Sequence, residues 1–539
     1  MEARTIVLIK AVTGGSKTDE YTEDFDAYSE DFDEVKLGES LALGYLKAFL
    51  ESQGRPWKVV VINPLIGTLS AEAVAALTDE HQPFLVGISL VYQWHRNFAF
   101  KLARLIKERL PRTHIVLGGL YTSSDWKGLL ERGAGRFDSI CRGEGEQTFL
   151  ELADVLAAGR EWRGLHGLAY LDQGTPVFHR RRRRIEELER LPFPDRDQLP
   201  GILGKGGVIQ LEASRGCNAG CTFCDVRHTG WIGRPPNHLV DELEQLAARH
   251  PDHEVWFIDN IFIGFRADRF ERAEKIADEI IRRGIRVRFS LQDRADNVER
   301  GVFLKLKAAG LNRVYIGIES FSESALRRWQ KGTSAVTNKK ALHTLKELGI
   351  LTQFGFLVFD GGTTLQEVRE NIEGLREVAA DNAYLHMHNF NELIPYAGTQ
   401  LEQEYIQEYG HAPDKNSRTP WRFPDARVRV FRDWAWKYLF HLWPVSEFVF
   451  HNFDDQLLQP DFPAILPAKN RCFVEYLESL YERVSEERPE QELWELCRSA
   501  VVATKEALGS SLRQWANSET RARAAEAIGS ISEKVTLPD

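Results

Sequence analysis

Short apolar runs alternate with amphipathic stretches along the first 155 residues of the chain. Five runs have the length and composition of buried strands, and they lie at Thr5–Ile9, Val59–Asn63, Phe84–Ser89, His114–Gly118 and Ser139–Cys141. Helical periodicity separates them at Leu41–Gln53, Ala71–Thr78 and Asn97–Leu110, and again from Glu146 onward. This alternation predicts a parallel sheet with crossover helices, in a doubly wound, flavodoxin-like domain. Ligands of such sheets bind beyond the carboxyl ends of the strands.

The same alternation resumes near residue 208 and continues for six units. The predicted strands are Val208–Ala213, Glu254–Ile258, Arg286–Leu291, Arg313–Gly317, Gln353–Phe359 and Tyr384–Asn389. The predicted helices are His238–Arg249, Arg269–Arg283, Gly301–Ala309, Ser324–Gln330, Asn338–Leu348 and Leu365–Val378. Six strand–helix units predict an open, partial TIM-type (β/α)6 barrel, in which catalytic loops gather at the carboxyl ends of the strands.

The expected organisation is an α/β chain with a doubly wound domain over 1–160, a linker over 161–200, the barrel over 201–395 and a helical domain over 396–539. The linker contains five consecutive arginines, Arg180 to Arg184. No stacking aromatics interleave with them, which favours a solvated segment paired to the acidic residues that follow over a nucleic-acid patch.

The C-terminal segment contains Trp421, Trp434, Trp436 and Trp443 within a short stretch. Such a cluster indicates a helical core, although the segment is also a candidate to cap the open barrel and supply substrate contacts. The acidic stretch Thr18–Glu34 is interpreted as a surface loop.

Composition narrows the class of protein. The formal net charge of −10 creates no general attraction for nucleic acid, and no apolar run approaches the length of a membrane span. No secretory leader is evident, and six cysteines do not form a disulfide framework in 539 residues. Cys141, Cys472 and Cys497 are interpreted as packing residues. We therefore expect a cytoplasmic protein with neither nucleic-acid nor membrane partners.

The run RGCNAGCTFCD places Cys217, Cys221 and Cys224 on one short loop with the spacing C-x3-C-x2-C. A structural zinc site takes four protein ligands, whereas an iron–sulfur cubane held by three cysteines leaves one iron open. An open iron can coordinate a small molecule, so the motif favours a reactive site. The alternatives are a zinc loop that borrows a distant histidine and chance spacing.

The cysteine motif and four runs downstream of it resemble the radical S-adenosylmethionine (SAM) superfamily. The runs are FIDN (Phe257 to Asn260), SLQDRAD (Ser290 to Asp296), YIGIES (Tyr315 to Ser320) and GFLVFDGGTT (Gly355 to Thr364). The resemblance implies a [4Fe–4S] cluster whose open iron is chelated by the amino and carboxylate groups of SAM. It also implies an electron donor such as flavodoxin or ferredoxin, and cleavage of SAM to a 5′-deoxyadenosyl radical.

The resemblance assigns roles to individual residues, with a strand-end cap as the alternative for each polar one. Cys217, Cys221 and Cys224 would ligate iron, and Phe223 would pack on the adenine or shield the cluster. The expected contacts to SAM or substrate are Asp259 and Asn260 for the methionine amino group, Gln292 and Arg294 for polar groups, and Glu319 and Ser320 for the ribose. Gly361 and Gly362 depart from the Gly-x-Pro-Gly-Glu-Thr run of many relatives.

A doubly wound domain before such a barrel resembles the cobalamin-binding class of radical SAM enzymes. Glycines allow backbone to approach a large ring closely. The expected cobalamin contacts are Ser89, Gly118, Gly119, Thr122, Ser123, Gly143, Glu144 and Gly145. The chain lacks an Asp-x-His-x-x-Gly run, so attachment through a histidine is not expected. Tyr92, Gln93, Trp94 and His95 are candidates for the lower face of the corrin, with His95 either a ligand or a packing residue. A relic domain that no longer binds cobalamin is the alternative.

Together these features predict a cobalamin-dependent radical SAM methyltransferase that moves a methyl group from methylcobalamin to a carbon of a small molecule or peptide, in a natural-product pathway. A rearrangement, cyclisation or ring contraction with the same cofactors is the alternative reaction. A non-catalytic cobalamin or iron–sulfur sensor is the alternative class. Methylthio transfer is disfavoured because the N-terminal domain contains no second group of three cysteines.

Overall fold

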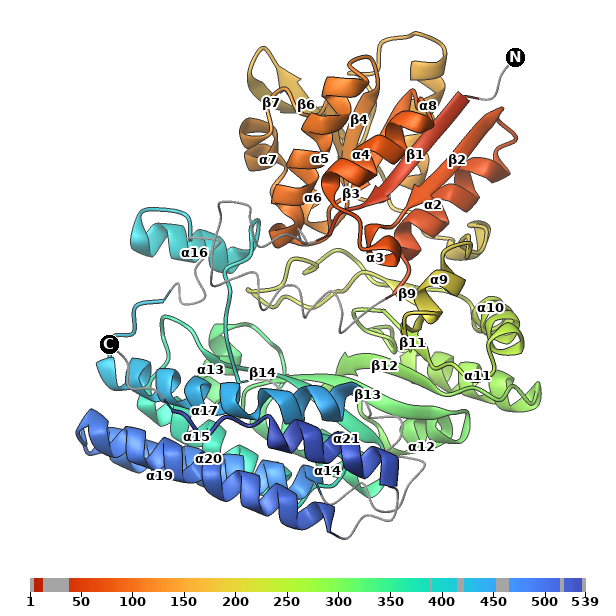
Figure 1. The fold of residues 1–539 in the computed structure, drawn as a ribbon. Coiled ribbons are helices and arrows are strands. Elements are labelled where there is room, and N and C mark those ends of the chain that lie inside the picture. Colours follow the sequence, from red (N-terminus) through yellow and green to blue (C-terminus); the bar gives the residue numbers. More distant parts are fainter. Residues whose placement is uncertain are drawn as a thin grey trace.

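The computed structural model describes residues 4–12, 38–387, 390–413, 421–451, 465–513 and 518–535. Its three layers follow the chain from top to bottom in Figure 1: the N-terminal sheet, the barrel sheet and a group of C-terminal helices. The predicted acidic loop Thr18–Glu34 lies outside the described residues, as does the end of the last predicted barrel strand.

The N-terminal sheet has the strand order β2-β1-β3-β4-β5-β6-β7. Its strands are β1 (Arg4–Lys10), β2 (Trp57–Ile62), β3 (Leu85–Ser89), β4 (His114–Gly118), β5 (Ser139–Cys141), β6 (Leu168–Asp172) and β7 (Thr175–Phe178). The first five strands are parallel, and their order 2-1-3-4-5 confirms the flavodoxin-like prediction. The carboxyl ends of β1 and β3 form the switch point where such sheets bind ligands.

The boundary predicted at residue 160 is wrong, because β6 and β7 extend this sheet as an antiparallel hairpin. The hairpin turns at Gln173 and Gly174, both with positive φ (47° and 84°). Two residues with positive φ form the tight turn whose twist matches that of paired strands. Gln-Gly is a weaker signal for this turn than Asn-Gly, and the adjacent arginines obscured the strand pattern.

Helices cover both faces of the N-terminal sheet. They are α2 (Leu41–Ser52), α3 (Pro64–Gly67), α4 (Ala71–Glu80), α5 (Arg96–Arg109), α6 (Leu120–Ser124), α7 (Trp126–Arg132) and α8 (Glu146–Ala157). On α5, Phe98, Leu102 and Ile106 are buried at helical spacing against the sheet. The short helices α3, α6 and α7 were not predicted, because none of them spans enough residues to show a period.

The barrel sheet has the parallel order β15-β14-β13-β12-β11-β8, which confirms the six predicted strands and their sequence in space. The strands are β8 (Ile209–Leu211), β11 (Val255–Phe257), β12 (Phe289–Arg294), β13 (Leu311–Glu319), β14 (Leu351–Phe359) and β15 (Leu385–His386), with β16 (Asn391–Glu392) also paired to β14. The short strands β9 (Ser214–Arg215) and β10 (Ile232–Gly233) form a separate antiparallel pair.

The barrel helices are α9 (Leu199–Leu203), α10 (Pro236–Arg249), α11 (Arg269–Arg282), α12 (Arg300–Ala308), α13 (Glu323–Arg328), α14 (Ala335–Glu347) and α15 (Leu365–Ala379). The start of α15 is fixed by a reciprocal capping box between Thr364 and Glu367. One continuous apolar core joins these helices, the strands beneath them and the C-terminal helices.

The C-terminal helices are α16 (Gln400–Tyr409), α17 (Ala426–His451), α19 (Ile465–Ser485), α20 (Glu490–Leu512) and α21 (Ser518–Gly529). Trp421 and Trp434 are buried, as predicted for a core. The idea that this segment as a whole caps the barrel is wrong. Helices α17 to α21 lie on the side of the barrel away from the N-terminal domain, and only α16 lies near the space between the two sheets (Figure 1).

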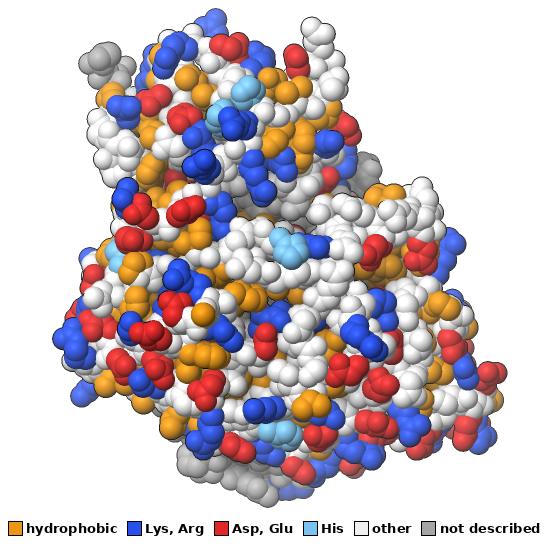
Figure 2. Space-filling view, turned by 180° about the vertical axis from the view of Figure 1, so that it is seen from behind, with side chains coloured by type: hydrophobic (Ala, Val, Ile, Leu, Met, Phe, Trp, Pro, Cys, Tyr) orange, Lys and Arg blue, Asp and Glu red, His pale blue; other side chains and the backbone are white. Residues whose placement is uncertain are grey.

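Among the described residues, no helix combines the length and the apolar character that crossing a membrane requires. On the face in Figure 2, acidic and basic side chains are interspersed over the barrel and the C-terminal helices.

Lys469 of α19 is buried, and its ammonium group donates a hydrogen bond to the carbonyl of Met387 at 2.7 Å. Burial lowers the pKa of Lys469 from 10.5 to about 7. Between these values the unfolded chain binds more protons than the folded one, so this lysine makes stability rise with pH from about 7 to 10.5.

We expect Lys469→Met to remove that rise. The measurement is the thermal unfolding midpoint of wild type and variant at pH 7 and pH 9. The unfolding midpoint of the variant minus that of wild type should become more negative from pH 7 to pH 9. Loss of the hydrogen bond to Met387 shifts this difference by the same amount at both pH values. The exposed Lys340→Met is the matched control and should track wild type. Parallel midpoints for Lys469→Met and wild type at both pH values would contradict this account.

Candidate functional site

The cysteine loop is anchored where it leaves the first barrel strand. Asp259, after β11, accepts hydrogen bonds from the hydroxyl of Ser214 and from the backbone N–H of Ala213 (3.1 Å). Asp259 is only 2% exposed, and burial raises its pKa to about 7. Its carboxylate therefore holds the start of the loop through both oxygens, and the direct contact of Asp259 to SAM stays a prediction. Asn260, the next residue, is exposed.

The middle of the loop is held by two segments far along the chain. The N–H of Thr222 donates to the carbonyl of Trp329 at 3.0 Å, and the carbonyl of Thr222 accepts from the N–H of Leu401 at 3.0 Å. The indole of Trp329 donates to Asp360 at 2.5 Å. Phe223 packs edge-on to Trp329, with ring centroids 6.4 Å apart. Trp329, Asp360 and Leu401 are thus supports of the site that sequence reasoning missed.

The thiols are sheltered from solvent. Cys217 and Cys221 are buried and Cys224 is half-buried. Burial raises the pKa of the Cys217 thiol, and it raises that of Cys224 to about 12. The positive charges of Arg294 and Lys331 act in the opposite direction on Cys217. A raised pKa favours the neutral thiol at Cys217 and Cys224, and a bound cation would reverse that preference.

The three thiols come from one short loop that is mostly sheltered from solvent. A cluster takes one sulfur on each of several irons, so three thiols on one loop fit a cluster with one open iron. Among the described residues, no group of three His, Cys, Asp or Glu side chains is arranged to hold a single metal ion.

The third and fourth barrel strands end in charged side chains beside the loop. Arg294 pairs with Asp296 at 2.8 Å and donates to the carbonyl of Lys331 at 2.8 Å. The ammonium group of Lys331 lies 2.8 Å from a carboxylate oxygen of Glu319, which has a positive φ of 64°. A left-handed backbone at a residue other than glycine is costly, and such strain concentrates at functional sites. Lys331 lies after α13, where no strand-end pattern could reveal it.

Ser320 and Gln292, both predicted to contact SAM, differ in their surroundings. Ser320 is fully buried, and its hydroxyl donates to Asn371 at 2.9 Å and accepts from the N–H of Ser322 at 3.0 Å. The predicted ribose contact of Ser320 is therefore not supported, because this hydroxyl shapes the turn after β13. Gln292 is half-buried and alternates with the buried Leu291, so it lies on the concave face of the sheet.

The concave face is lined by apolar groups that are open to solvent. Ile258 is 39% exposed and Tyr315 is 36% exposed, although both belong to the strand layer of the barrel. Gly317 pairs with Gly355 on the neighbouring strand. A Cβ on Gly355 would lie 2.9 Å from Tyr315 Oη and from Glu319 Oε2. The two glycines make room for Tyr315 and Glu319 on this face of the sheet.

In the N-terminal domain, glycines open a cradle at the carboxyl edge of the sheet. A Cβ added to Gly118, Gly143 or Gly145 would meet no atom within 4 Å. Gly119 has a φ of 112°, and a Cβ there would lie 2.6 Å from the carbonyl oxygen of Leu90. Gly119 is therefore required by the close approach of two loops, whereas the other three glycines face open space. The cradle fits a large flat ligand such as a corrin.

The polar side chains predicted around this cradle are mostly engaged in contacts within the protein, so fewer of them can contact a ligand. Thr122 is fully buried, and its hydroxyl donates to the carbonyl of Gly119 at 2.7 Å. Ser123 accepts from the N–H of Gly143 at 3.0 Å, which ties two cradle loops together. Glu144 accepts from the N–H of Ile185 at 2.6 Å. Ser89 is buried at the end of β3. Backbone, more than these side chains, is left to contact a ligand.

The candidate residues for the lower face of the corrin form an aromatic cluster. Tyr92 and Trp94 stack with centroids 4.6 Å apart, and the ring of His95 lies edge-on to both. His95 is 1% exposed. It is therefore a packing residue, and Tyr92 is the exposed member of the cluster.

Tyr92 faces the barrel side of the molecule. Burial raises the pKa of Tyr396 to about 12, and the nearby Asp225 and Tyr92 add to the rise. Asp225 directly follows the last cysteine of the loop. An aromatic residue of the first domain, the cysteine loop and the segment before α16 thus meet at one place.

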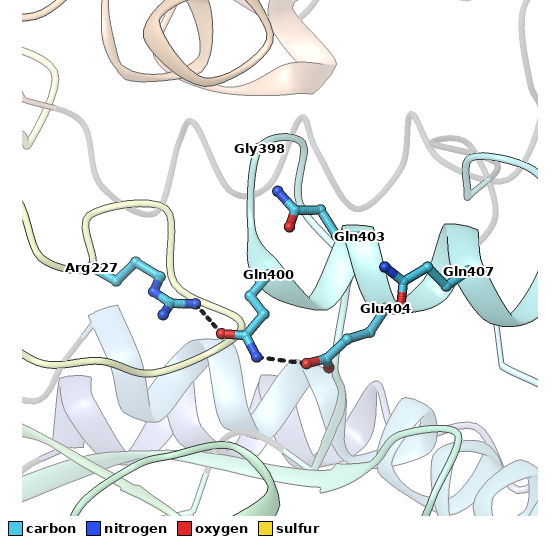
Figure 3. A pocket seen from close by; sticks show the side chains of 6 residues that line it. All are labelled: Arg227, Gly398, Gln400, Gln403, Glu404 and Gln407. Atoms are coloured by element: carbon cyan, nitrogen blue, oxygen red, sulfur yellow. Dashed lines mark hydrogen bonds between the residues drawn. The ribbon is translucent and has the colours of Figure 1, made fainter.

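A groove of about 540 Å³ lies beside this meeting point (Figure 3). It is lined by Arg227, Gly398, Gln400, Gln403, Glu404 and Gln407. Arg227 donates to Gln400 at 2.6 Å, and Gln400 donates to Glu404 at 2.7 Å. The amides lie along one face of α16 at positions i, i+3 and i+7. This wall is polar and can both donate and accept hydrogen bonds.

Two family models match the chain. Residues 36–153 match the B12 binding domain, and residues 211–375 match the radical SAM superfamily. The matches cover the glycine cradle and the cysteine loop respectively.

Curated relatives resemble the chain at moderate identity. An uncharacterized methyltransferase of Pyrococcus horikoshii is 28% identical over 372 residues, which are 68% of this chain and 78% of that protein. The 4′-phospho-dehydrooxetanocin synthase of Priestia megaterium is 28% identical over 63% of this chain, which spans only about half (49%) of that protein. The anaerobic magnesium-protoporphyrin IX monomethyl ester cyclase of Rubrivivax gelatinosus is 27% identical, over 72% of this chain and 70% of that protein.

Solved structures share the fold. The cobalamin-dependent SAM radical enzyme OxsB, with aqua-cobalamin and SAM bound, superposes with a TM-score of 0.74 at 18% identity, over 99% of this chain and 85% of that chain. The radical SAM methyltransferase TsrM from Kitasatospora setae, with tryptophan and a SAM analogue bound, has a TM-score of 0.57 at 20% identity, over 75% of this chain and 77% of that chain. The arrangement of two sheets is therefore a known one.

The glycine cradle can be tested by filling it. Gly118 does not have positive φ and has open space at its Cβ, so Gly118→Leu should fold normally. We expect at least about a tenfold loss in affinity for cobalamin, measured by titration of the corrin absorption, with an unchanged unfolding midpoint. Gly164→Leu, also in open space but outside the cradle, is the control. Equal cobalamin affinity in both variants would exclude this edge of the sheet as the cobalamin-binding site.

The cysteine loop can be tested by metal content. Anaerobically reconstituted wild type should hold about four irons with matching sulfide, and Cys221→Ala should lose most of both. Cys472→Ala, at a half-buried cysteine of α19, should keep them. Zinc in place of iron, or full iron retention by Cys221→Ala, would refute the cluster.

Proposed function

This chain belongs to the cobalamin-dependent radical SAM enzymes, and from that premise we propose that it transfers a methyl group to a carbon of a small-molecule or peptide substrate. The strongest support for a reaction that uses both cofactors together is the contact between their two candidate sites. The loop after β5, in the glycine cradle, contacts the cysteine loop after β8 through ion pairs, of which Glu146 to Arg215 measures 2.8 Å. The carboxyl ends of the two parallel sheets therefore open onto a common space.

The cofactors supply the bond chemistry. When bound, the cluster with SAM supplies a 5′-deoxyadenosyl radical for hydrogen abstraction, and cobalamin supplies a transferable methyl group. Cys217, Cys221 and Cys224 would hold the cluster, and the backbone around Gly118, Gly143 and Gly145 would hold the corrin.

The chain itself orients the substrate and excludes water. Tyr315 and Ile258 would present an apolar surface on the concave face, where such a surface displaces solvent from reacting groups. Glu319 and Lys331 neutralise each other at 2.8 Å, so both charges can remain on this face without attracting free ions. Asn260 and Gln292 remain available for polar contacts to SAM, as the sequence predicts.

The groove along α16 would hold the part of the substrate that does not react. Its amides, one guanidinium and one carboxylate match a substrate that carries amide or hydroxyl groups. Its position beside Asp225 and Tyr396 places such a group next to the cysteine loop. Binding energy from this remote contact can position the reacting carbon.

Relatives with different reactions keep a second candidate open. A synthase and a cyclase match the chain about as well as the methyltransferase does. A rearrangement or ring closure would use the same cysteine loop and glycine cradle. The shape of the concave face of the barrel sheet would then set the fate of the substrate radical.

The type of reaction can be identified before the substrate itself is known. Anaerobic enzyme is incubated with SAM labelled in its methyl group, a reductant and extracts of small molecules or peptides, and products are searched by mass spectrometry. We expect 5′-deoxyadenosine together with a product that carries a labelled methyl group on carbon.

The other outcomes separate the candidates. Deoxyadenosine with a changed but unlabelled product would support rearrangement or cyclisation instead. No deoxyadenosine from protein that holds both cofactors would exclude an enzyme of this type and favour a sensor.

A further inference from the structure

The arginine run at 180–184 lies outside the cofactor sites described above, and it is not the solvated linker that the sequence suggested. Arg180, Arg181 and Arg183 are exposed, whereas Arg182 and Arg184 are half-buried. The buried members alternate along an extended strap that follows β7. Their partners are not the glutamates that follow in the sequence.

Arg182 fastens the strap to the N-terminal domain. Its guanidinium donates to Glu151 at 3.1 Å and to the hydroxyl of Thr148 at 3.0 Å, both on α8. It also donates to the carbonyl of His166 at 3.2 Å. The strap is therefore a fixed part of the first domain up to this residue.

Arg184 reaches from the strap to the cysteine loop. Its guanidinium donates to the carbonyl of Thr229 at 2.6 Å and to that of Gly230. Its other end lies 3.4 Å from Glu144, whose second oxygen accepts from the N–H of Ile185 at 2.6 Å. One guanidinium thus joins the loop of the glycine cradle to the loop that carries the cysteines. Only arginine presents a planar fork that can serve both sides.

The contact continues to a predicted cluster ligand. The hydroxyl of Thr229 accepts from the N–H of Cys217 at 3.1 Å and donates to the carbonyl of Val226 at 2.8 Å. The residue whose carbonyl Arg184 holds is therefore the same residue that fixes the backbone of Cys217. A Cβ on Gly216 would lie 2.8 Å from the Arg184 guanidinium, so the loop passes closely over it.

Arg215 makes a second bridge in parallel. It donates to Glu146 at 2.8 Å and to Glu212 at 2.8 Å, and it lies 3.8 Å from Glu144. The side chains of Arg215 and Glu146 are 13% and 7% exposed, so solvent screens this pair far less than a surface pair. Two guanidinium groups therefore link the same two loops.

We propose that Arg184, supported by Arg215, is a positioning residue that sets the spacing between the cobalamin loop, residues 143–146, and the cysteine loop, residues 215–231. The proposal rests on the proposed function, since only a reaction shared by both cofactors needs that spacing fixed. The carbon that loses hydrogen to one cofactor must face the methyl group of the other. A misplacement of about 1 Å can cost about a hundredfold in rate.

The structural half of the proposal is tested without cofactors or activity. Hydrogen–deuterium exchange is followed by mass spectrometry in wild type, Arg184→Gln and Arg183→Gln. Arg183→Gln is the matched control, because it removes an exposed positive charge from the same arginine run. We expect Arg184→Gln to speed exchange by at least about tenfold at the amides of Ile185 and Cys217, with other regions unchanged. Arg183→Gln should match wild type. Unchanged exchange at both amides in Arg184→Gln, or faster exchange throughout, would overturn the proposal.

The catalytic half is tested by the ratio of methylated product to 5′-deoxyadenosine. Arg184→Gln should keep its cluster and cleave SAM near the wild-type rate, while the ratio falls by at least about tenfold. Arg184→Lys, which keeps the charge but not the fork, should recover part of the ratio. If Arg184→Gln does not fold, Glu144→Gln opens the same bridge from its other end. An unchanged ratio in a variant with faster exchange would overturn the positioning role.

These two readouts keep the failure of this proposal apart from failure of the proposed function. Wild type that forms no methylated product would refute methyl transfer, while the exchange measurement would still decide whether Arg184 joins the loops.

Discussion

The structure depends on one geometric constraint: two parallel sheets from different parts of the chain point their carboxyl ends at the same space. Parallel sheets bind ligands at that edge, because their loops and helix starts gather there. Glu144 and Glu146 stand on the last loop of one edge, and Arg184 and Arg215 bind them beside the first loop of the other. Partly buried ion pairs suit this task because they are directional and weakly screened.

The cysteine loop shows how much of a reactive site consists of support. Three thiols carry the chemistry, yet the loop is held by Asp259 where it begins, by Trp329 at its middle and by Thr229 near its end. Asp259 and Trp329 are buried and Thr229 is half-buried, so these side chains expose little surface to a ligand. The residues left free for a ligand are those with exposed or half-exposed side chains, such as Asn260 and Gln292.

Much of the fold could be predicted from the sequence, because strands and helices here have clear and different periods. The flavodoxin-like order of the first five strands and the six-stranded partial barrel followed from that alternation of strands and helices. The hairpin β6–β7 and the arginine strap could not be read in the same way. Their meaning comes from partners such as Glu151 and Gly230, which lie far away in sequence.

The part of the candidate site that is a compact sequence motif could be predicted. The part that consists of residues distant in sequence and brought together by folding could not. The three cysteines are contiguous, so their spacing carried the information. Lys331, Tyr396 and Leu401 are brought to the loop only by folding, and Thr122 and Ser320 are hidden by folding. Strand-end position alone cannot tell a side chain that faces a ligand from one that closes a turn.

If both cofactors face one shared space, their unpaired electrons lie close together. Electron paramagnetic resonance of anaerobic protein that holds the reduced cluster and Co(II) cobalamin detects this proximity, since two nearby spins broaden and split each other's signals. We expect the spectrum of the doubly loaded protein to differ from the sum of the two singly loaded spectra. A spectrum equal to that sum would place the cofactors far apart and refute a shared site.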